Sequence, residues 1–350
     1  MKAFRMWTRH AIVLLAVFGA ASAACAEDFT IADVSDARKT DVAQMKPGTI
    51  VFSDHTGAGA VDSEVALFHF DEWADKHPVE KKFLALFPGY VEPTDPKTVN
   101  GTTSQVLEKL YMYIAQARFV VDKAPGAIDL SRYVTLPFLQ KIDPAITHQT
   151  LAPSDIGPFN DEAGTGNDNP DRKWCTGRTT SICFQSSYKL EGKIPMGILL
   201  VNKLRDGSKK VADHIDFQSE LSALSPADLD QAALQELTAL DTPVSGVLEQ
   251  DLFYVNQIMK FGKFFAVFQS DPNDAKKTVV TAFMILAIKA SVLDEKRGYE
   301  NMPVLRNLVP AQVLMGQSSF NSGSSISAGL PVYARNEIKT IAGILGHDSK

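Results

Sequence analysis

Apolar residues recur at two different intervals along the chain, and the first is typical of helices. From Leu107 to Val121 they follow one another at steps of three or four, and Thr102 with Gln105 forms a capping-box pattern before them. Other elements are expected earlier in the chain: a strand over 48–54 and helices over 61–76 and 79–87. The N-terminal third is therefore predicted to be mainly helical.

The second interval, a strict alternation of apolar and polar residues, begins after residue 173. Over 182–191 and again over 211–221 every second residue faces one side of an extended chain, as in strands with one wet face. Asp206-Gly207 between them is a hairpin signal. The apolar runs 197–204 and 263–269 are predicted to add strands. We expect an antiparallel sheet of about four to five strands.

Helical spacing returns at Ser225, an N-cap residue that is followed by Pro226. Four helices are expected in this part: 225–240, 248–259, 303–313 and one from residue 331 onward. The apolar run Thr278–Lys289 fits a buried strand and a buried helix equally. The predicted fold class is α+β, an antiparallel sheet covered by helices, with a mainly helical N-terminal part.

A segment rich in Pro, Gly, Asn and Asp separates the two patterns. It divides the chain into four predicted regions: 1–26, a signal peptide; 27–142, a mainly helical N-terminal region; 143–173, a linker or long loop; 174–350, an α+β region.

The first 26 residues have the composition of a secretory signal peptide. Basic residues precede an apolar run over 11–21, which is too short to span a bilayer, and small residues follow it. Cleavage after Ala26 fits these residues best, and cleavage after Ala23 and lipidation of Cys25 are the alternatives. We therefore expect an exported, periplasmic bacterial protein.

The net charge of the chain and the length of its apolar runs limit the kinds of partner that we expect. The formal net charge is -6, and loss of the basic leader makes the chain more acidic. An acidic chain repels nucleic acid and anionic membrane surfaces. No later apolar run is long enough to span a membrane. We expect no nucleic-acid partner and no transmembrane segment in the mature chain; the oligomeric state stays open.

Cys175 and Cys183 are predicted to form a disulfide bond. They do not have the C-x-x-C spacing of a redox pair, and no histidine or second cysteine pair lies at zinc-finger spacing. Disulfides persist in oxidising compartments. Closing so short a loop contributes about 2.6 kcal/mol in the chain-entropy treatment. The predicted role of the bond is structural.

His214 and Asp216 are the leading candidates for ligand binding. They lie two residues apart on a predicted strand and so on one side of it, Glu220 continues their row, and Lys189 lies on a neighbouring strand. Such a row suits a divalent cation or a histidine base oriented by a carboxylate. A solvated sheet face needs the same residue types, and we favour that interpretation.

No motif assigns a reaction, and the catalytic residues are unknown. The acidic segment 160–171 lacks the residue order of an EF-hand. Ser186 and Lys189 spell S-x-x-K, but the companion motifs of that chemistry are missing. H-E-x-x-H, Walker A and dinucleotide fingerprints are also missing. We expect no cofactor and no resident metal.

Two functions remain open. The phenylalanines over 261–268 and the apolar run to Ile288 are the basis for a cavity between sheet and helices. The favoured hypothesis is a non-enzymatic periplasmic binding or envelope-associated protein that holds an apolar ligand. The alternative is a hydrolase or metal-dependent enzyme that uses the polar row around His214 and Asp216.

Overall fold

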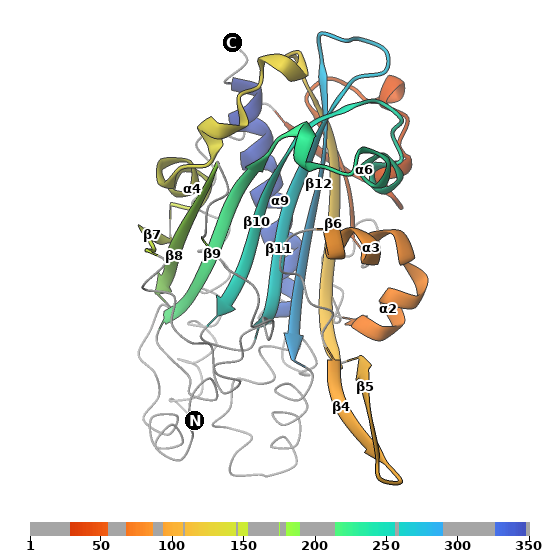
Figure 1. The fold of residues 1–350 in the computed structure, drawn as a ribbon. Helices are drawn as coiled ribbons and strands as arrows, with labels where there is room; N and C mark the ends of the chain where they lie inside the picture. The colour runs from red at the N-terminus through yellow and green to blue at the C-terminus, as the bar shows by residue number, and fades with distance from the viewer. Residues whose placement is uncertain are drawn as a thin grey trace, which may run out of the picture.

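A large mixed sheet forms the centre of the molecule in a computed structural model (Figure 1). The structure describes residues 29–54, 68–86, 94–107, 109–144, 146–152, 175, 180–189, 214–255, 259–289 and 326–347. Within these residues the strand order is β1-β2-β6-β12-β11-β10-β9-β8-β7, and β3 also pairs with β6. The strands are β1 (Thr30–Asp33), β2 (Thr49–Asp54), β3 (Phe68–His69), β6 (Leu110–Val121), β7 (Thr147–Thr150), β8 (Ser181–Lys189), β9 (His214–Leu224), β10 (Val244–Val255), β11 (Met259–Ser270) and β12 (Thr278–Lys289).

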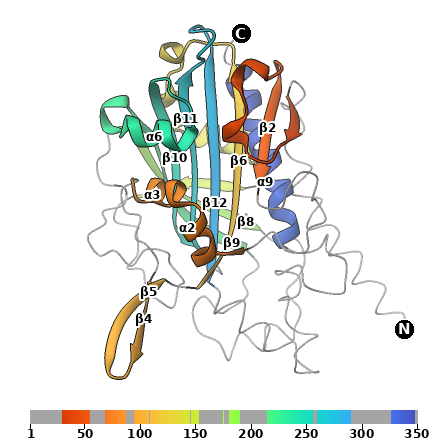
Figure 2. The same ribbon diagram turned by 90° about the vertical axis from the view of Figure 1, so that its right-hand side faces the viewer.

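Helices cover both faces of this sheet (Figures 1 and 2). Those described are α2 (Phe70–Lys76), α3 (Pro78–Leu86), α4 (Leu136–Ile142), α6 (Gln231–Thr238) and α9 (Ile326–His347). Short 3-10 turns are η1 (Ala37–Lys39), η2 (Val42–Gln44), η3 (Pro125–Ala127), η4 (Leu130–Tyr133) and η8 (Pro226–Asp228). We call the face that packs against α2, α3 and α6 the outer face, and the face that packs against α4 and α9 the inner face.

The predicted fold class is wrong in the size of the sheet and in the N-terminal part. The sheet has nine strands in one path within the described residues, and β1 pairs with β2 in parallel, so it is neither four- to five-stranded nor wholly antiparallel. Residues 110–121, predicted as a helix, form β6 between β2 and β12. Tyr113 and Ile114 point to opposite faces and both are buried. A strand buried on both faces lacks the polar alternation that marks a strand in sequence.

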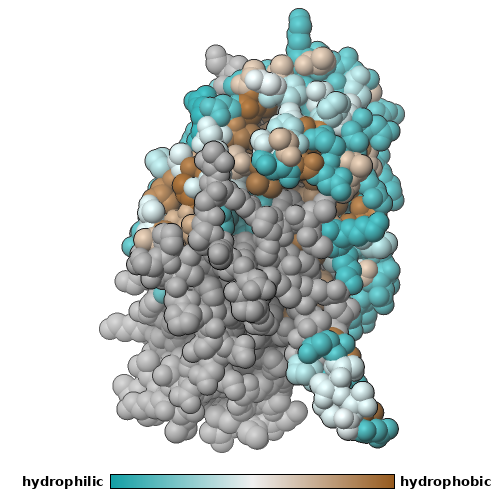
Figure 3. Space-filling model, viewed as in Figure 1, coloured by the Kyte–Doolittle hydropathy of each residue, from teal (hydrophilic) through white to brown (hydrophobic). Residues whose placement is uncertain are grey.

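A two-stranded hairpin also forms part of the N-terminal region that was predicted to be mainly helical. β4 (Thr94–Val99) and β5 (Thr102–Leu107) pair with each other and project from the body of the molecule (Figures 1 and 3). Asn100 and Gly101 join them with φ of 53° and 77°. An Asn-Gly turn with both residues at positive φ is the strongest short hairpin signal, so Thr102 begins a strand and does not cap a helix.

The prediction of a helix over 248–259 is also wrong, because residues 248–255 belong to β10 and Met259 begins β11. Charged residues on the outer face of β10 are buried, so the strand carries no simple polar stripe. The run Thr278–Lys289 forms β12, which decides the open choice in favour of a strand. The strands predicted around 48–54 and 263–269, and the helix around 79–87, are confirmed as β2, β11 and α3.

The helices predicted near 225 and 331 form, with different starts. Asp230 caps α6 by accepting a hydrogen bond from the backbone amide of Ala233, and Ser225 precedes only the turn η8. Pro331 lies inside α9, which begins at Ile326. No helix in the described residues is long and apolar enough to cross a membrane.

Arg118 on β6 links the outer face of the sheet to neighbouring backbone segments by hydrogen bonds. Its guanidinium donates to Oγ1 of Thr281 and to the carbonyl oxygens of Arg38, Thr40 and Thr238. The side chain is almost fully buried, and burial lowers the pKa of Arg118 to about 10. It therefore ties α6 and the segment after β1 to the sheet.

Some predictions fall on residues outside the described part. These are the signal peptide at 1–26, the strand at 197–204, the hairpin signal at 206–207, the helix at 303–313 and the acidic segment 160–171.

Candidate functional site

Small side chains form the middle of the inner face. The backbone register aligns one residue from each of β6, β12, β11, β10 and β9 in a row: Ala117, Ala282, Ala266, Leu248 and Ala223. Ala282, Leu248 and Ala223 keep partial exposure although they lie within paired strands. Because protein interiors are normally close-packed, exposed positions in the middle of a covered sheet indicate space above them.

The outer face has no comparable space in the described residues. Phe265 and Phe283 stack with ring centroids 4.7 Å apart, and Phe83 of α3 lies 4.2 Å from Phe265. Among the described residues, the partly exposed apolar side chains of this core are Val79, Leu224 and Leu229. The inner core has a much longer set: Ile31, Ile128, Leu130, Leu136, Ile182, Ala223, Leu248, Phe264, Ala282, Leu330, Tyr333 and Ile341. The partly exposed apolar side chains therefore gather on the inner face.

One flank of α9 is fixed to the N-terminal strands. Arg335 pairs with Asp33 at 2.7 Å and with Asp54 at 3.6 Å, and its guanidinium lies 4.3 Å from the centroid of the Phe52 ring. The hydroxyl of Tyr113 donates to Asp54 at 3.0 Å. Burial and the carboxylate of Asp54 raise the pKa of Tyr113 well above its usual range, so it stays a donor. These contacts hold the helix across the sheet.

The opposite flank of α9 faces the space. Ile338 on the middle of the helix is buried against the inner core, and a rotation of about 100° per residue places Tyr333, Glu337 and Ile341 to one side of it, away from Arg335. All three are only partly buried. This flank combines apolar side chains with a phenol and a carboxyl group.

The carboxyl group of Glu337 lies in surroundings that disfavour its charge. Burial raises the pKa of Glu337 well above its usual range, and the nearby carboxylate of Asp143 raises it further. Burial and the same two carboxyl groups raise the pKa of Tyr333. Glu337 therefore stays protonated at pH values where an exposed glutamate is ionised, and both side chains can donate hydrogen bonds.

The segment between β6 and α4 closes the space from another side. Ile128, Leu130 and Leu136 pack on the inner core and keep partial exposure. Gly246 of β10 permits this approach, because a Cβ atom there would lie 2.7 Å from Cδ1 of Leu130. Aliphatic side chains thus cover the ends of the central strands.

A histidine and a serine meet at the far edge of the inner face. Nδ1 of His148 lies 2.8 Å from Oγ of Ser186, and burial lowers the pKa of the histidine. The two residues are directly paired across β7 and β8. Ser186 is fully buried, so a substrate cannot reach it. The pair therefore holds β7 onto β8, and it is not arranged as a nucleophile and base open to substrate.

The residues predicted to bind a ligand lie on two neighbouring strands, as expected. Lys189 pairs with His214 across β8 and β9, and Asp216 pairs with Ser187. Asp216 is partly buried, and Glu220 is 5 % exposed on the outer face, away from the space under α9. The side chains of Lys189 and His214 lie outside the described part, so their chemistry stays a prediction.

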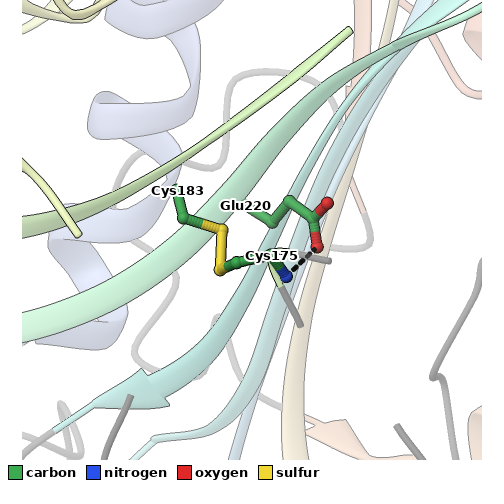
Figure 4. A group of neighbouring side chains, drawn as sticks. All are labelled: Cys175, Cys183 and Glu220. Atoms are coloured by element: carbon green, nitrogen blue, oxygen red, sulfur yellow. Dashed lines mark hydrogen bonds between the residues drawn. A yellow bond between two sulfur atoms is a disulfide. The ribbon is translucent and has the colours of Figure 1, made fainter. Parts of the chain in front are cut away.

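The predicted disulfide between Cys175 and Cys183 is present in the structure (Figure 4). Cys183 is directly opposite Glu220 in the register of β8 and β9. The backbone amide of Cys175 donates to Oε2 of Glu220 at 3.3 Å. The polar face that the alternation predicted to be wet is therefore buried at this point.

Three buried charges next to Glu220 were not anticipated from the sequence. Nζ of Lys263 lies 2.8 Å from Oδ1 of Asp251 and 3.1 Å from Oε1 of Glu249, and all three side chains are almost fully buried. A lysine inside the apolar run 261–268 was the available signal. The partners of Lys263 could not be identified from the sequence, because 248–259, which contains Glu249 and Asp251, was predicted as a helix.

Comparison with protein-family models gives no match, and neither does comparison with the sequences of curated proteins. Among solved structures, the chain is similar to an aromatase/cyclase, Zhui, from Streptomyces sp. R1128, with a TM-score of 0.32, 11 % identity and coverage of 67 % of this chain and 93 % of that one. Human STARD10 gives a TM-score of 0.25 at 8 % identity, covering 69 % and 78 %. Norcoclaurine synthase from Thalictrum flavum gives 0.25 at 8 % identity, covering 59 % and 89 %. At these scores the likeness establishes neither a shared fold nor a shared function.

Proposed function

We propose that the protein binds an apolar small molecule between the inner face of the sheet and α9, as a binding protein that does not transform its ligand. The carrying observation is the row Ala117, Ala282, Ala266, Leu248 and Ala223, in which three members stay partly exposed beneath covering elements. Pockets for small molecules are concave, mostly apolar and furnished with a few polar groups.

Polar side chains on α9 and β10 support a molecule with one polar end. Tyr333 and Glu337 lie on the flank of α9 that faces the space, and the raised pKa of each keeps it a hydrogen-bond donor. Gln250, on the row next to the alanines, is also partly buried. A carbonyl or hydroxyl oxygen on an otherwise apolar body would match these groups.

Native mass spectrometry of the purified protein tests the proposal first, because a bound apolar molecule survives gentle ionisation and adds its mass. A titration with the neutral fluorescent probe N-phenyl-1-naphthylamine then measures the site directly. Ala223→Phe places an aromatic ring in the proposed space and should weaken probe binding at least about tenfold, since loss of a well-packed apolar contact costs more than about 1.4 kcal/mol.

Val106→Phe is the matched control, because it adds the same ring on the projecting hairpin, where Val106 is 38 % exposed. It should leave probe affinity unchanged. Absence of both a co-purified ligand and saturable probe binding would refute the proposal. Equal affinities of the parent, Ala223→Phe and Val106→Phe would place any binding elsewhere and refute it as well.

We also propose that the protein is exported to the periplasm. The basic start, short apolar run and small residues of 1–26 support this, and the disulfide between Cys175 and Cys183 suits an oxidising compartment. Cell fractionation with the intact mass of the recovered chain tests it. A chain that begins after Ala26 in the periplasmic fraction is expected, and a full-length chain confined to the cytoplasm would refute export.

A further inference from the structure

The disulfide and Glu220 form a compact group on the outer face. The two sulfur atoms and a carboxylate oxygen of Glu220 all lie within 4.8 Å of one another (Figure 4). Cys183 and Glu220 are directly paired on β8 and β9, so the strands fix their relative position. Cys183 is 7 % and Glu220 is 5 % exposed, and Cys175 is partly buried above them.

Glu220 is a buried carboxylate that has no cationic partner within the described residues. Within the described residues its one hydrogen bond comes from the backbone amide of Cys175, and it has no ion pair. The buried ammonium of this region, on Lys263, pairs with Asp251 and Glu249. Asp251 is directly opposite Glu220 on β10. Lys263 is thus engaged by the carboxylates of Asp251 and Glu249, and a buried carboxylate such as that of Glu220 is costly without a counter-charge.

We propose that reduction of the disulfide converts this group into a zinc site formed by Cys175, Cys183 and Glu220. Two thiolates and a carboxylate are zinc ligands, and three protein ligands leave one position for water. Zn–S bonds of about 2.3 Å and Zn–O bonds of about 2.1 Å put tetrahedral ligand atoms less than about 4 Å apart. After reduction the two sulfur atoms would move apart to this separation, and the oxygen of Glu220 already lies within 4.8 Å of them.

An external dithiol supplies the electrons and protons that reduction of the disulfide requires. The dithiol transfers two electrons to the disulfide and is itself oxidised to a disulfide, the Sγ–Sγ bond breaks, and the two protons of the dithiol pass to the two cysteine sulfurs. Zn²⁺ then displaces both thiol protons to solvent as the Zn–S bonds form. The sulfur atoms of an intact disulfide are poor ligands, so metal binding reports the redox state of the pair.

Zinc binding to the full-length chain before and after reduction tests this proposal. The chain is reduced with the dithiol, the dithiol is removed under anaerobic conditions, zinc is titrated against a chromophoric chelator, and bound metal is counted by elemental analysis. We expect about one zinc per reduced chain and none per oxidised chain. With cobalt in place of zinc, the reduced chain should show thiolate-to-metal charge-transfer absorption.

Variants separate this site from adventitious metal. Cys175→Ser should abolish stoichiometric zinc, and Glu220→Gln, which keeps both sulfurs, should weaken it at least about tenfold, as even outer partners of metal ligands contribute that much. Glu236→Gln removes an exposed carboxylate of α6 and should change nothing. Circular dichroism checks the fold of each protein. Equal zinc on oxidised and reduced chains, zinc retained by Cys175→Ser, equal affinities of Glu220→Gln and Glu236→Gln, or unfolding of the reduced parent would each overturn the proposal.

Discussion

Replacing alanine by leucine at two positions of β12 should distinguish an inner face with room from an outer face without it. Ala282 lies on the inner face, is partly exposed and has Ala117 and Ala266 as its cross-strand neighbours. Ala287, in the same strand, is fully buried on the outer face. Both changes have the same effect on strand propensity, so their difference reports the space around each side chain.

The size of the difference follows from the neighbours. Ala287 is paired with Met112 and Phe261, both buried, so a leucine there overpacks the outer core and should cost about 1–3 kcal/mol. A leucine at Ala282 points toward small neighbours and gains about 0.8 kcal/mol for each methyl or methylene group removed from water. We expect the free energy of unfolding of Ala282→Leu to stay within about 1 kcal/mol of the parent.

Urea unfolding followed by tryptophan fluorescence measures both variants, with Trp73 buried in the outer core as a reporter. The comparison is valid when the dependence of unfolding on urea is equal in the three proteins. A loss of 1–3 kcal/mol in Ala282→Leu, equal to that in Ala287→Leu, would mean that the inner face is as closely packed as the outer one. The argument for a ligand space would then fail.

Substitution or titration of three other buried polar residues should change stability in a measurable way. Because the folded state raises the pKa of Glu337, stability is lost as the pH rises through that raised pKa. Glu337→Gln should therefore raise the thermal unfolding temperature at about pH 8. At about pH 4 the unfolding temperature should stay unchanged. Arg118→Met leaves buried carbonyl groups unpaired and should cost at least about 3 kcal/mol in urea unfolding, whereas the exposed Arg132→Met should cost under about 0.5 kcal/mol. Burial lowers the pKa of His148, so its contribution to stability is lost as the pH falls through that lowered value; an NMR titration should give a pKa below about 6.5.

The sequence predicted local features well where one residue type determines the structure. The pairing of Cys175 with Cys183 required only compartment and spacing, and the strand at 263–269 is rich in phenylalanine. β6 and β10 could not be predicted in the same way, because their alternate residues are buried on both faces. In β6 helical spacing then arises by chance within a nearly continuous apolar run, and in β10 the charged residues Glu249 and Asp251 are buried, so tertiary burial decides both structures.

The candidate site was predictable only in part, for a related reason. The phenylalanines over 261–268 do contribute to the inner face through Phe264 and Phe268, but Phe261 and Phe265 belong to the outer core. The row of Ala117, Ala282, Ala266, Leu248 and Ala223 comes from five strands, and its members are neighbours only through the register of the whole sheet. Ala223, for example, is an unremarkable residue in the sequence.

The two faces of β9 explain how one sheet can accommodate both proposals. Successive side chains of a strand point to opposite faces, so Glu220 lies beneath the disulfide while its neighbour Leu221 belongs to the inner core. The outer face is closely packed by α2, α3 and α6 and by the ion pairs of Lys263. Because that core holds the strands in register, the inner face could accommodate the proposed space without loss of the fold. Close packing of α2, α3 and α6 on the outer face thus supports the proposed apolar-ligand space on the inner face.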